Sequence, residues 1–294
     1  MTDPAVPADR AEPSDRAAGA LILAGTPLGR ISDASPGLAR ALADADVIAA
    51  EDTRRFLRLA ADLGVDLHAK VVSFYESVEA ARVPGLVDRI AGGQRVVLVT
   101  DAGMPSVSDP GYTLVAAVAA AGLAVTSVPG PSAVITALAL SGLPSDRFTF
   151  EGFPPRKTGE RTRAFGALRT EARTMVFFES VHRIGESLAA MAAVFGADRP
   201  AAVCRELTKT HEEVRRGPLG ELAAWAADGL RGEITVVVAG SSGAGDAPPD
   251  DATLLAEIAA LVAGGKSRRD AVDQVAATYD LNRRSVYALA TARR

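Results

Sequence analysis

The chain has 294 residues, a formal net charge of −4 and a hydrophobic share of 48%, enough to bury more core than one average domain needs. Cys204 is the only cysteine, which excludes an intrachain disulfide and a zinc site built from cysteines and favours the reducing cytoplasm. The three histidines lie far apart along the sequence, so we predict no metal site. No apolar run approaches the roughly 18 to 20 residues of a membrane span, so we expect a soluble protein.

The first 19 residues combine Pro, Ala, Asp and Arg without an apolar run, which predicts a disordered tail rather than a signal peptide. Residues 20–142 then alternate short apolar runs with amphipathic stretches, the pattern of parallel strands joined by crossover helices. The expected strands cover 20–24, 47–50, 71–74, 96–100 and 124–128, and the expected helices begin near Ser35, Thr53, Val78, Gly111 and Pro131. We therefore predict a first α/β lobe that binds ligands at the carboxyl ends of its strands.

Residues 143–240 show another pattern, in which FTFEGF, TMVFFES, AAVCRE and EITVVVAG indicate strands of a second α/β lobe with a mixed sheet. Residues 241–251 are rich in Gly, Ser and Pro and are predicted to form a linker. Residues 252–294 keep apolar residues at helical spacing, with Asn282 as a helix cap, and predict two or three short helices. The predicted fold class is α/β, with two lobes and a small C-terminal helical unit.

Two segments are basic although the chain as a whole is acidic. Residues 156–173 and residues 266–294 each carry a net charge of +4, and both lie beyond the first lobe. The local charge matters more than the average charge for a nucleic-acid partner. These segments are therefore where a nucleic-acid partner, if the chain has one, would be contacted.

Glycine-rich loops follow three of the expected strands. LILAGTPLGRISD, residues 21–33, lacks the Gly-Lys-Ser/Thr of a P-loop and the three spaced glycines of a dinucleotide fold, so it is either an ordinary turn or a ligand loop. VVLVTDAGMPSVSDPG, residues 96–111, holds more Gly, Pro, Ser and Asp than a turn needs, so we expect Asp101 to bind a ligand, with helix capping as the alternative. In SVPGPSAVITAL, residues 127–138, Ser132 is either a helix cap or a ligand contact.

Three further motifs place ionisable residues directly after an apolar strand: AAEDTRR at 49–55, FFESVHRI at 177–184 and CRELTKTHEEVRRG at 204–217. They are compatible with a solvated network of salt bridges. They are equally compatible with a grip on phosphate and ribose, in which a carboxylate or a lysine takes a proton from a hydroxyl. The candidate bases are Asp52, Glu206 and Lys209.

The chain carries, in this order, GTPLGRISD, AEDTR, TDAGMPSVSDPG, PGPSA, FEGFPPRK, ESVHRI, RELTKTHEE and GEITVVV. This succession resembles the tetrapyrrole-methylase superfamily, and within it the branch that methylates ribosomal RNA. The resemblance covers residues 20–240 and, more weakly, the C-terminal helices. It implies a two-lobed fold, often a homodimer, with S-adenosylmethionine as cofactor. It also implies 2′-O-methylation of a cytidine in the decoding region of 16S rRNA, as free rRNA or in the small ribosomal subunit.

The resemblance also implies a set of site residues. The cofactor-binding positions are Pro27, Leu28, Gly29, Asp101, Ala102, Gly103, Pro105, Ser106, Ser132, Ala133 and Gly232. The loop FEGFPPRK is expected to face the RNA with its basic end. Together with the other basic segments, this gives the expected RNA contacts Arg156, Lys157, Arg205, Arg268, Arg269, Arg283 and Arg284.

Two alternative functions are compatible with the same motifs. A corrin or porphyrin precursor methyltransferase acts on a large acidic macrocycle, which basic residues beside the cofactor loops would also suit. A non-catalytic nucleotide-sensing, ribosome-binding protein could use the glycine loops without any proton acceptor. The basic C-terminal segment favours an RNA substrate over a macrocycle.

Overall fold

The computed structural model describes residues 19–241, 251–279 and 281–291. The predicted tail, up to residue 18, and the predicted linker, over residues 242–250, lie outside the described residues, as do Arg293 and Arg294 of the basic C-terminal segment. The chain separates into two compact units, one ending at Pro131 and the other beginning at Ser132. No helix in these ranges is long and apolar enough to cross a membrane.

The first unit is built around a parallel sheet of five strands in the order β3-β2-β4-β1-β5. Its strands are β1 (Ala20–Ala24), β2 (Val47–Ala50), β3 (Lys70–Ser73), β4 (Arg95–Val99) and β5 (Ala124–Val128). All four residues of β2 are buried, as expected for a parallel strand that is covered by helices on both faces. The predicted parallel sheet is confirmed, with each strand within one residue of its expected bounds.

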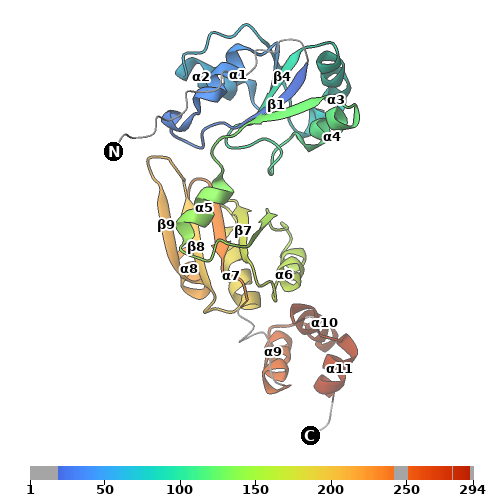
Figure 1. Cartoon of the computed structure of the whole chain (residues 1–294). Coiled ribbons are helices and arrows are strands. Elements are labelled where there is room, and N and C mark those ends of the chain that lie inside the picture. The colour runs from blue at the N-terminus through green and yellow to red at the C-terminus, as the bar shows by residue number, and fades with distance from the viewer. Residues whose placement is uncertain (1–18, 242–250, 280, 292–294) are drawn as a thin grey trace, which may run out of the picture. The chain divides into compact units, whose positions relative to one another are not determined.

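Helices cover both faces of this sheet (Figure 1). α1 (Pro36–Ala43) and α2 (Thr53–Asp62) pack on one face, and α3 (Glu76–Ala91) and α4 (Tyr112–Ala120) pack on the other. A 3₁₀ turn, Ile31–Asp33, precedes α1. The hydroxyl of Ser35 accepts a hydrogen bond from Leu38 N at 3.1 Å and caps α1. The arrangement leaves the carboxyl ends of all five strands at one edge of the sheet.

The second unit has a mixed sheet in the order β6-β7-β10-β8-β9. Its strands are β6 (Phe148–Gly152), β7 (Thr174–Glu179), β8 (Pro200–Arg205), β9 (Glu213–Pro218) and β10 (Ile234–Val238). β6 and β7 are parallel, and the remaining pairs are antiparallel. This confirms the mixed sheet. Strand β9 was not predicted, because its sequence EVRRGP has the charges and proline of an edge strand rather than an apolar run.

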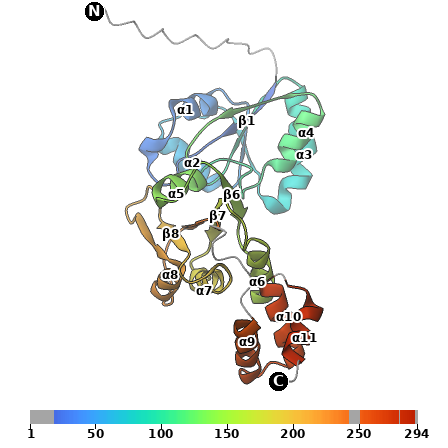
Figure 2. The same cartoon turned by 60° about the horizontal axis from the view of Figure 1, so that its bottom comes forward.

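Four helices pack on the second sheet (Figure 2). α6 (Thr158–Ala167), α7 (Ile184–Phe195) and α8 (Leu219–Trp225) share one apolar core with alternate strand residues such as Val203 and Val236. α5 (Ala133–Ser141) packs on β8 and β10, where the buried thiol of Cys204 lies 3.8 Å from the carbonyl oxygen of Ala137. The helix therefore belongs to the second unit, although the sequence pattern placed it in the lobe that ends at residue 142.

The C-terminal residues form three helices within the described ranges: α9 (Asp251–Ala263), α10 (Arg268–Thr278) and α11 (Arg283–Thr291). They share a small apolar core of their own, which includes Leu254, Val272 and Val286. Asn282 caps α11, since its side-chain oxygen accepts a hydrogen bond from Arg284 N at 2.9 Å. α10 also packs on α6.

Candidate functional site

The loops after β1 and β5 touch through two glycines. A Cβ atom on Gly25 would lie 2.7 Å from the Cα of Gly130, and a Cβ atom on Gly130 would lie 2.7 Å from the Cα of Gly25. Because Cβ atoms do not approach backbone this closely, a side chain at either position would force the loops apart. Glycine is therefore required at both positions for close packing.

The loop after β4 joins the loop after β1 through an antiparallel bridge. Thr26 N donates to the Gly103 carbonyl at 2.9 Å, and Gly103 N donates to the Thr26 carbonyl at 3.1 Å. The buried hydroxyl of Thr26 donates to the carbonyl of Thr100 at 3.1 Å. Gly103 has a φ of +84°, a conformation that favours glycine. The glycine-rich loops of the first unit thus lie together at the carboxyl edge of its sheet.

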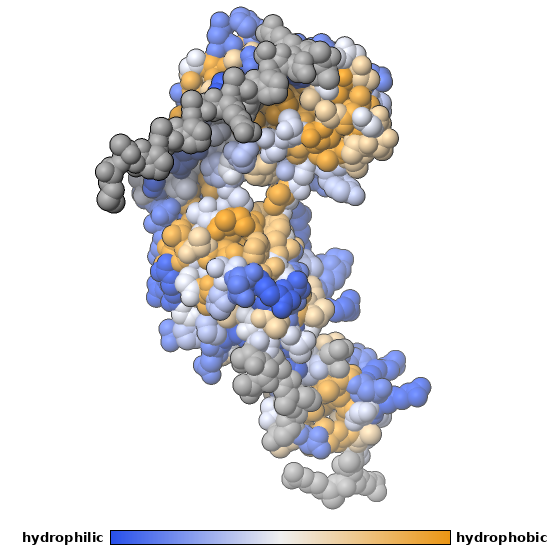
Figure 3. All heavy atoms as spheres, viewed as in Figure 1, coloured by the Kyte–Doolittle hydropathy of each residue, from blue (hydrophilic) through white to orange (hydrophobic). Residues whose placement is uncertain are grey.

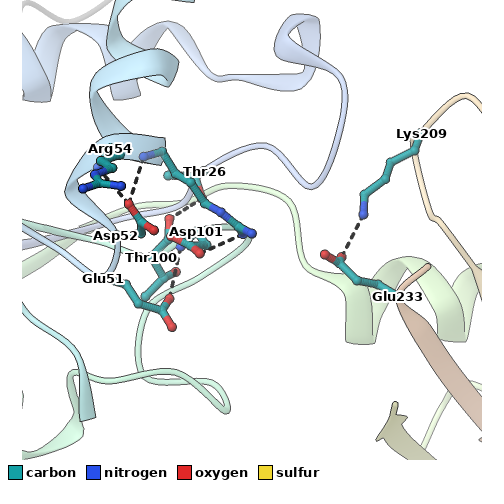
Figure 4. A network of polar contacts seen from close by, with 9 residues as sticks. Thr26, Glu51, Asp52, Arg54, Thr100, Asp101, Lys209 and Glu233 are labelled. Carbon is teal, nitrogen blue, oxygen red and sulfur yellow. Dashed lines mark hydrogen bonds and ion pairs between the residues drawn. The ribbon is translucent and has the colours of Figure 1, made fainter. Parts of the chain in front are cut away.

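Three carboxylates gather at this edge, after β2 and β4: Glu51, Asp101 and Asp109. Asp101 N donates to Glu51 Oε2 at 3.2 Å, and Arg55 Nη1 donates to Asp101 Oδ2 at 2.9 Å (Figure 4). Arg55 lies on α2, and its side chain is 70% exposed. The side chain of Asp101 therefore pairs with Arg55. It does not cap a helix, which is the alternative role that the sequence allows.

Burial raises the pKa of all three carboxyls. In Glu51 burial outweighs the hydrogen bond from Asp101 N, and in Asp101 it outweighs the attraction of Arg55. Burial, together with the nearby charge of Glu51, raises the pKa of Asp109 to about 7. A positive charge placed beside the cluster would stabilise the ionised form of each member. The edge is therefore suited to a ligand that carries a cationic group.

A pocket of about 210 Å³ lies at this edge within the first unit. Its lining includes the polar Glu51 and Asp101, the apolar Leu28 and Phe56, and the predicted loop residues Pro27 and Gly29. Most ligand pockets measure roughly 300 to 1,000 Å³, so this one accommodates only part of a cofactor such as S-adenosylmethionine. The residues fit that cofactor, because glycines allow close backbone approach, apolar walls suit an adenine ring and carboxylates suit positive charges.

The other predicted cofactor residues occupy two places. Ala102, Pro105 and Ser106 belong to the loop after β4, and Ser106 has a φ of +71°. Ser132 and Ala133 begin the second unit, where the carbonyl of Ser132 accepts a hydrogen bond from Thr136 N at 2.9 Å. The side chain of Ser132 makes no capping hydrogen bond to α5, so helix capping does not account for it. A cofactor role for these residues stays a prediction.

In the second unit, Glu206, directly after β8, packs against Gly232 in the segment that precedes β10. Glu206 Oε1 accepts hydrogen bonds from Glu233 N at 2.8 Å and from Lys209 Nζ at 3.0 Å. Lys209 also pairs with Glu233 at 3.1 Å (Figure 4). Gly232 has a φ of +89°, and a Cβ atom on it would lie 2.3 Å from the Glu206 carboxyl carbon. A side chain at Gly232 would thus displace the carboxylate that links the two segments.

The three candidate bases are engaged in structural contacts. Asp52 caps α2 by accepting hydrogen bonds from Arg54 N at 2.8 Å and Arg55 N at 3.1 Å, and these bonds lower its pKa. The hydrogen bond from Glu233 N lowers the pKa of Glu206 in the same way. Burial lowers the pKa of Lys209, but Glu206 and Glu233 together raise it by more. The net increase keeps Lys209 protonated. These directions disfavour a base role near neutral pH.

The sequence pattern alone does not single out Asp109, although it lies in the motif TDAGMPSVSDPG. The available signal was a second Asp eight positions after Asp101 in a loop that already contained one strand-end carboxylate. Glu51 lies in the motif AEDTR, and the sequence pattern predicts no role for it either. Only the fold shows that these carboxylates lie near Asp101.

The predicted RNA contacts divide into paired and unpaired cations. Arg205 pairs with Glu213 at 2.8 Å, and Arg283 pairs with Asp273. Among the residues that the structure describes, no ion pair involves the five remaining cations, apart from the contact of Lys157 with Glu160 at 3.1 Å. All five side chains are exposed: Arg156, Lys157, Arg268, Arg269 and Arg284. The four cations without an ion pair in the described ranges are available to phosphates, whereas Lys157, Arg205 and Arg283 first have to leave a carboxylate.

Across the described ranges, no three His, Cys, Asp or Glu side chains are grouped so that they could hold a metal ion. A reaction without a metal requirement stays a prediction.

Comparison with known proteins supports the family resemblance that the sequence motifs indicate. The family model described as Tetrapyrrole (Corrin/Porphyrin) Methylases matches residues 20–223. The protein named ribosomal RNA small subunit methyltransferase I from Mycobacterium tuberculosis is 53% identical over 262 residues, covering 89% of this chain and 90% of the relative. The protein of the same name from Escherichia coli O157:H7 is 39% identical and covers 81% and 84% of the two chains.

A solved structure supports the fold. The uroporphyrin-III C-methyltransferase of Thermus thermophilus, described as complexed with S-adenyl homocysteine, superimposes with a TM-score of 0.52 at 18% identity, covering 75% of this chain and 97% of that one. The chain therefore belongs to the tetrapyrrole (corrin/porphyrin) methylase family and, within it, to the group of proteins named ribosomal RNA small subunit methyltransferase I.

Proposed function

We propose that this chain transfers a methyl group from S-adenosylmethionine to the 2′-oxygen of a cytidine ribose in the decoding region of 16S rRNA. The observation that carries the proposal is the similarity to a relative named for methylation of small-subunit rRNA. The two sequences are 53% identical, and the match covers 90% of the relative's length. The strand-end edge of the first unit supports it, because it combines a glycine cradle with carboxylates. We place the reaction in the cytoplasm, where ribosomes are assembled.

S-adenosylmethionine is the methyl donor, and when bound it supplies an electrophilic methyl group on a positively charged sulfur. In the first unit, the loop from Pro27 to Gly29 and the loop from Asp101 to Ser106 would hold it, and Glu51 and Asp101 would balance its positive charge. Gly25 and Gly130 keep the loops close enough for backbone groups to bind it. Alignment is the main contribution of these residues, because fixing a reactant in place removes several kcal/mol of barrier.

A residue of this chain must accept the proton of the ribose hydroxyl, since a hydroxyl is a weak acid. Asp109 is better suited to accept this proton than Asp52, Glu206 or Lys209. Its pKa of about 7 leaves a substantial ionised fraction at neutral pH and gives it more proton affinity than an ordinary carboxylate. It also lies in the same loop as Asp101. Replacement by Asn keeps the shape and removes the proton acceptor.

We propose that the C-terminal unit, α9 to α11, holds the RNA while the loops of the first unit perform the chemistry. The exposed Arg268, Arg269 and Arg284 support this role. Cations gain affinity by releasing counterions from phosphates, so RNA binding should fall steeply with salt. The helices have a core of their own, so a chain truncated after Gly240 should keep its cofactor affinity and lose most of its rRNA methylation.

We also propose a homodimer. Both units carry hydrophobic residues on their surfaces (Figure 3), and the exposed large side chains include Tyr112 on α4 and Ile135 and Leu140 on α5. A helix that is apolar all round normally packs on more than one side, and a symmetric pair is the commonest closed assembly. Light scattering at micromolar concentration should give twice the chain mass.

The experiment that tests the function is mapping of ribose methylation on 16S rRNA in cells with and without this chain, followed by transfer of labelled methyl groups in vitro to small subunits and to free rRNA. We expect one cytidine to lose its 2′-O-methyl group without the chain. A corrin or porphyrin precursor methyltransferase would leave the rRNA unchanged and label a macrocycle. A non-catalytic ribosome-binding protein would label neither.

A further inference from the structure

The loop between β6 and α6, residues 153–157, presents an aromatic ring to solvent. Phe153 is 54% exposed, although burying a side chain of its size is normally favourable. Its ring centroid lies 5.5 Å from that of Phe178, which in turn lies 4.9 Å from Phe150 in an edge-on contact. Phe153 thus rests on a row of rings along one side while the rest of its ring remains exposed.

The backbone of this loop is held in one shape. Gly152 has a φ of +66°, and the pairing of β6 with β7 shifts register at this point. Two prolines follow, and they limit the backbone further. The first of them, Pro154, is buried, and its carbonyl accepts a hydrogen bond from Arg183 Nη1 at 3.3 Å. The loop is therefore attached to the start of α7 through the carbonyl of Pro154.

Arg183 is itself fixed by the ESVHRI motif. Its Nη2 pairs with Glu179 Oε1 at 3.0 Å, and its Nε donates to Ser180 Oγ at 3.1 Å. The Glu179 side chain is fully buried and also accepts hydrogen bonds from Ser180 N at 2.7 Å and from the hydroxyl of Ser187. This motif was open to two interpretations, a salt-bridge network or a phosphate grip. The contacts favour the network, and they give it the task of positioning the loop.

The chemistry beside Phe153 selects a nucleic acid as the ligand. Arg156 and Lys157 are exposed, and Arg163 is exposed one turn along α6. Lys157 contacts Glu160, whereas no ion pair involves Arg156 in the described part of the chain. An aromatic ring with basic neighbours is the usual surface for unpaired bases, which stack on the ring while the cations contact phosphates. The exposed residues that follow the ring along the loop are the cations Arg156 and Lys157, which suit phosphates better than an apolar protein partner.

We propose that Phe153 is a base-stacking residue for single-stranded RNA, with Arg156 and Lys157 on the adjoining phosphates and Arg183 as the positioning residue of the loop. The inference rests on the proposed rRNA function and adds a requirement that the contacted nucleotide be unpaired. In a duplex the faces of the bases are covered by their neighbours, so the ring cannot stack on them.

The test uses the full chain and a short single-stranded oligoribonucleotide from the 16S decoding region, with the same strand in a duplex as a control. Phe153→Ala and Phe153→Leu should weaken single-strand binding by about 5- to 100-fold, and Phe153→Trp should retain it. Leu keeps the apolar character of the site and removes the aromatic face, so it separates stacking from apolar contact. Because Phe153 is 54% exposed and contacts Phe178 along one side only, these variants should stay folded, with melting temperatures within a few degrees of the parent chain.

The salt dependence provides a matched comparison. Phe153→Ala should leave the slope of log affinity against log salt unchanged, while Arg156→Ala should lower it by roughly 0.7, the value for one phosphate on a single strand. Unchanged single-strand affinity in Phe153→Ala, or parent-like affinity in Phe153→Leu, would overturn the inference. The inference would also be overturned if Phe153→Ala changed the oligomeric mass and left the RNA affinity unchanged, because that result would assign the ring to a protein interface.

Methylation of small subunits by the parent chain is measured in the same preparations. If the parent chain methylates rRNA and Phe153→Ala binds and methylates equally well, the stacking inference alone is wrong. If the parent chain transfers no methyl group to rRNA, the proposed function is wrong as well.

Discussion

The two units of this protein both place carboxylates at the carboxyl ends of their strands, but they surround them differently. In the first unit, burial raises the pKa of Glu51, Asp101 and Asp109, and Arg55 contacts only Asp101 among them through an ion pair. In the second unit, Glu179 and Glu206 each accept hydrogen bonds from a backbone N–H and from a cationic side chain. The first arrangement leaves charge to be balanced by a ligand, and the second is complete in itself.

This difference separates the residues that act on a ligand from the residues that hold the fold. Sequence alone does not reveal it, because AEDTR, ESVHRI and RELTKTHEE are all polar motifs that follow apolar strands. If the comparison is right, neutralising a carboxylate should reduce stability in the second unit and ligand binding in the first.

The largest effect on stability is expected from Glu179→Gln. This change leaves the half-buried Arg183 without its carboxylate, and breaking a buried ion pair by removing one partner is strongly destabilising. Since Arg183 retains some exposure, we expect a loss of about 2 to 4 kcal/mol in the free energy of unfolding. Urea unfolding of the full chain measures it. A loss below about 0.5 kcal/mol would show that the ESVHRI network is not the support we describe.

A smaller, pH-dependent effect is expected from Asp109→Asn. The folded pKa of Asp109, about 7, lies above its ordinary value of 3.8, so its contribution to stability is complete below about pH 4 and is lost as the pH rises through 7. Asn does not ionise, so the melting temperature of the variant relative to the parent chain should increase between pH 5 and pH 8. Thermal melts at these two pH values provide the measurement, and a difference that stays constant would contradict a raised pKa.

The smallest effect is expected from Asp52→Ala. Asp52 caps α2, and loss of a cap should lower the melting temperature by a few degrees. The turnover number for rRNA methylation should remain within a few-fold of the parent value, because the lowered pKa of Asp52 makes it a poor base. Steady-state kinetics separates the two roles. A drop of about 100-fold or more in turnover at unchanged stability would restore Asp52 as the proton acceptor.

Much of the fold could be predicted from the sequence, because its strands are apolar runs bounded by Gly, Pro or Asp. β2, with four buried residues, is such a run. The edge strand β9 could not be predicted, since its residues are exposed or half-buried and several carry charge. The unit to which α5 belongs could not be predicted either, because a helix with apolar residues on all sides gives no sign of which sheet it covers.

The glycine loops of the candidate site could be predicted, but the state of their carboxylates could not. Burial and neighbouring charge set the pKa of a carboxyl, and both depend on contacts between segments far apart in sequence. Glu51 and Asp101, for example, are brought together by the pairing of β2 with β4. The proposed bases Glu206 and Lys209 had the right chemistry in sequence, yet the fold pairs them with each other.

The central claim, that the carboxylates of the first unit serve a ligand, is tested most directly by calorimetric titration of S-adenosylmethionine into two matched variants. Asp101→Asn and Glu171→Gln each neutralise a carboxylate that pairs with an arginine, one in each unit. We predict that Asp101→Asn weakens binding by about tenfold or more, as expected for loss of a charge-assisted contact, and that Glu171→Gln leaves it unchanged. Equal affinities in Asp101→Asn and the parent chain would contradict the account.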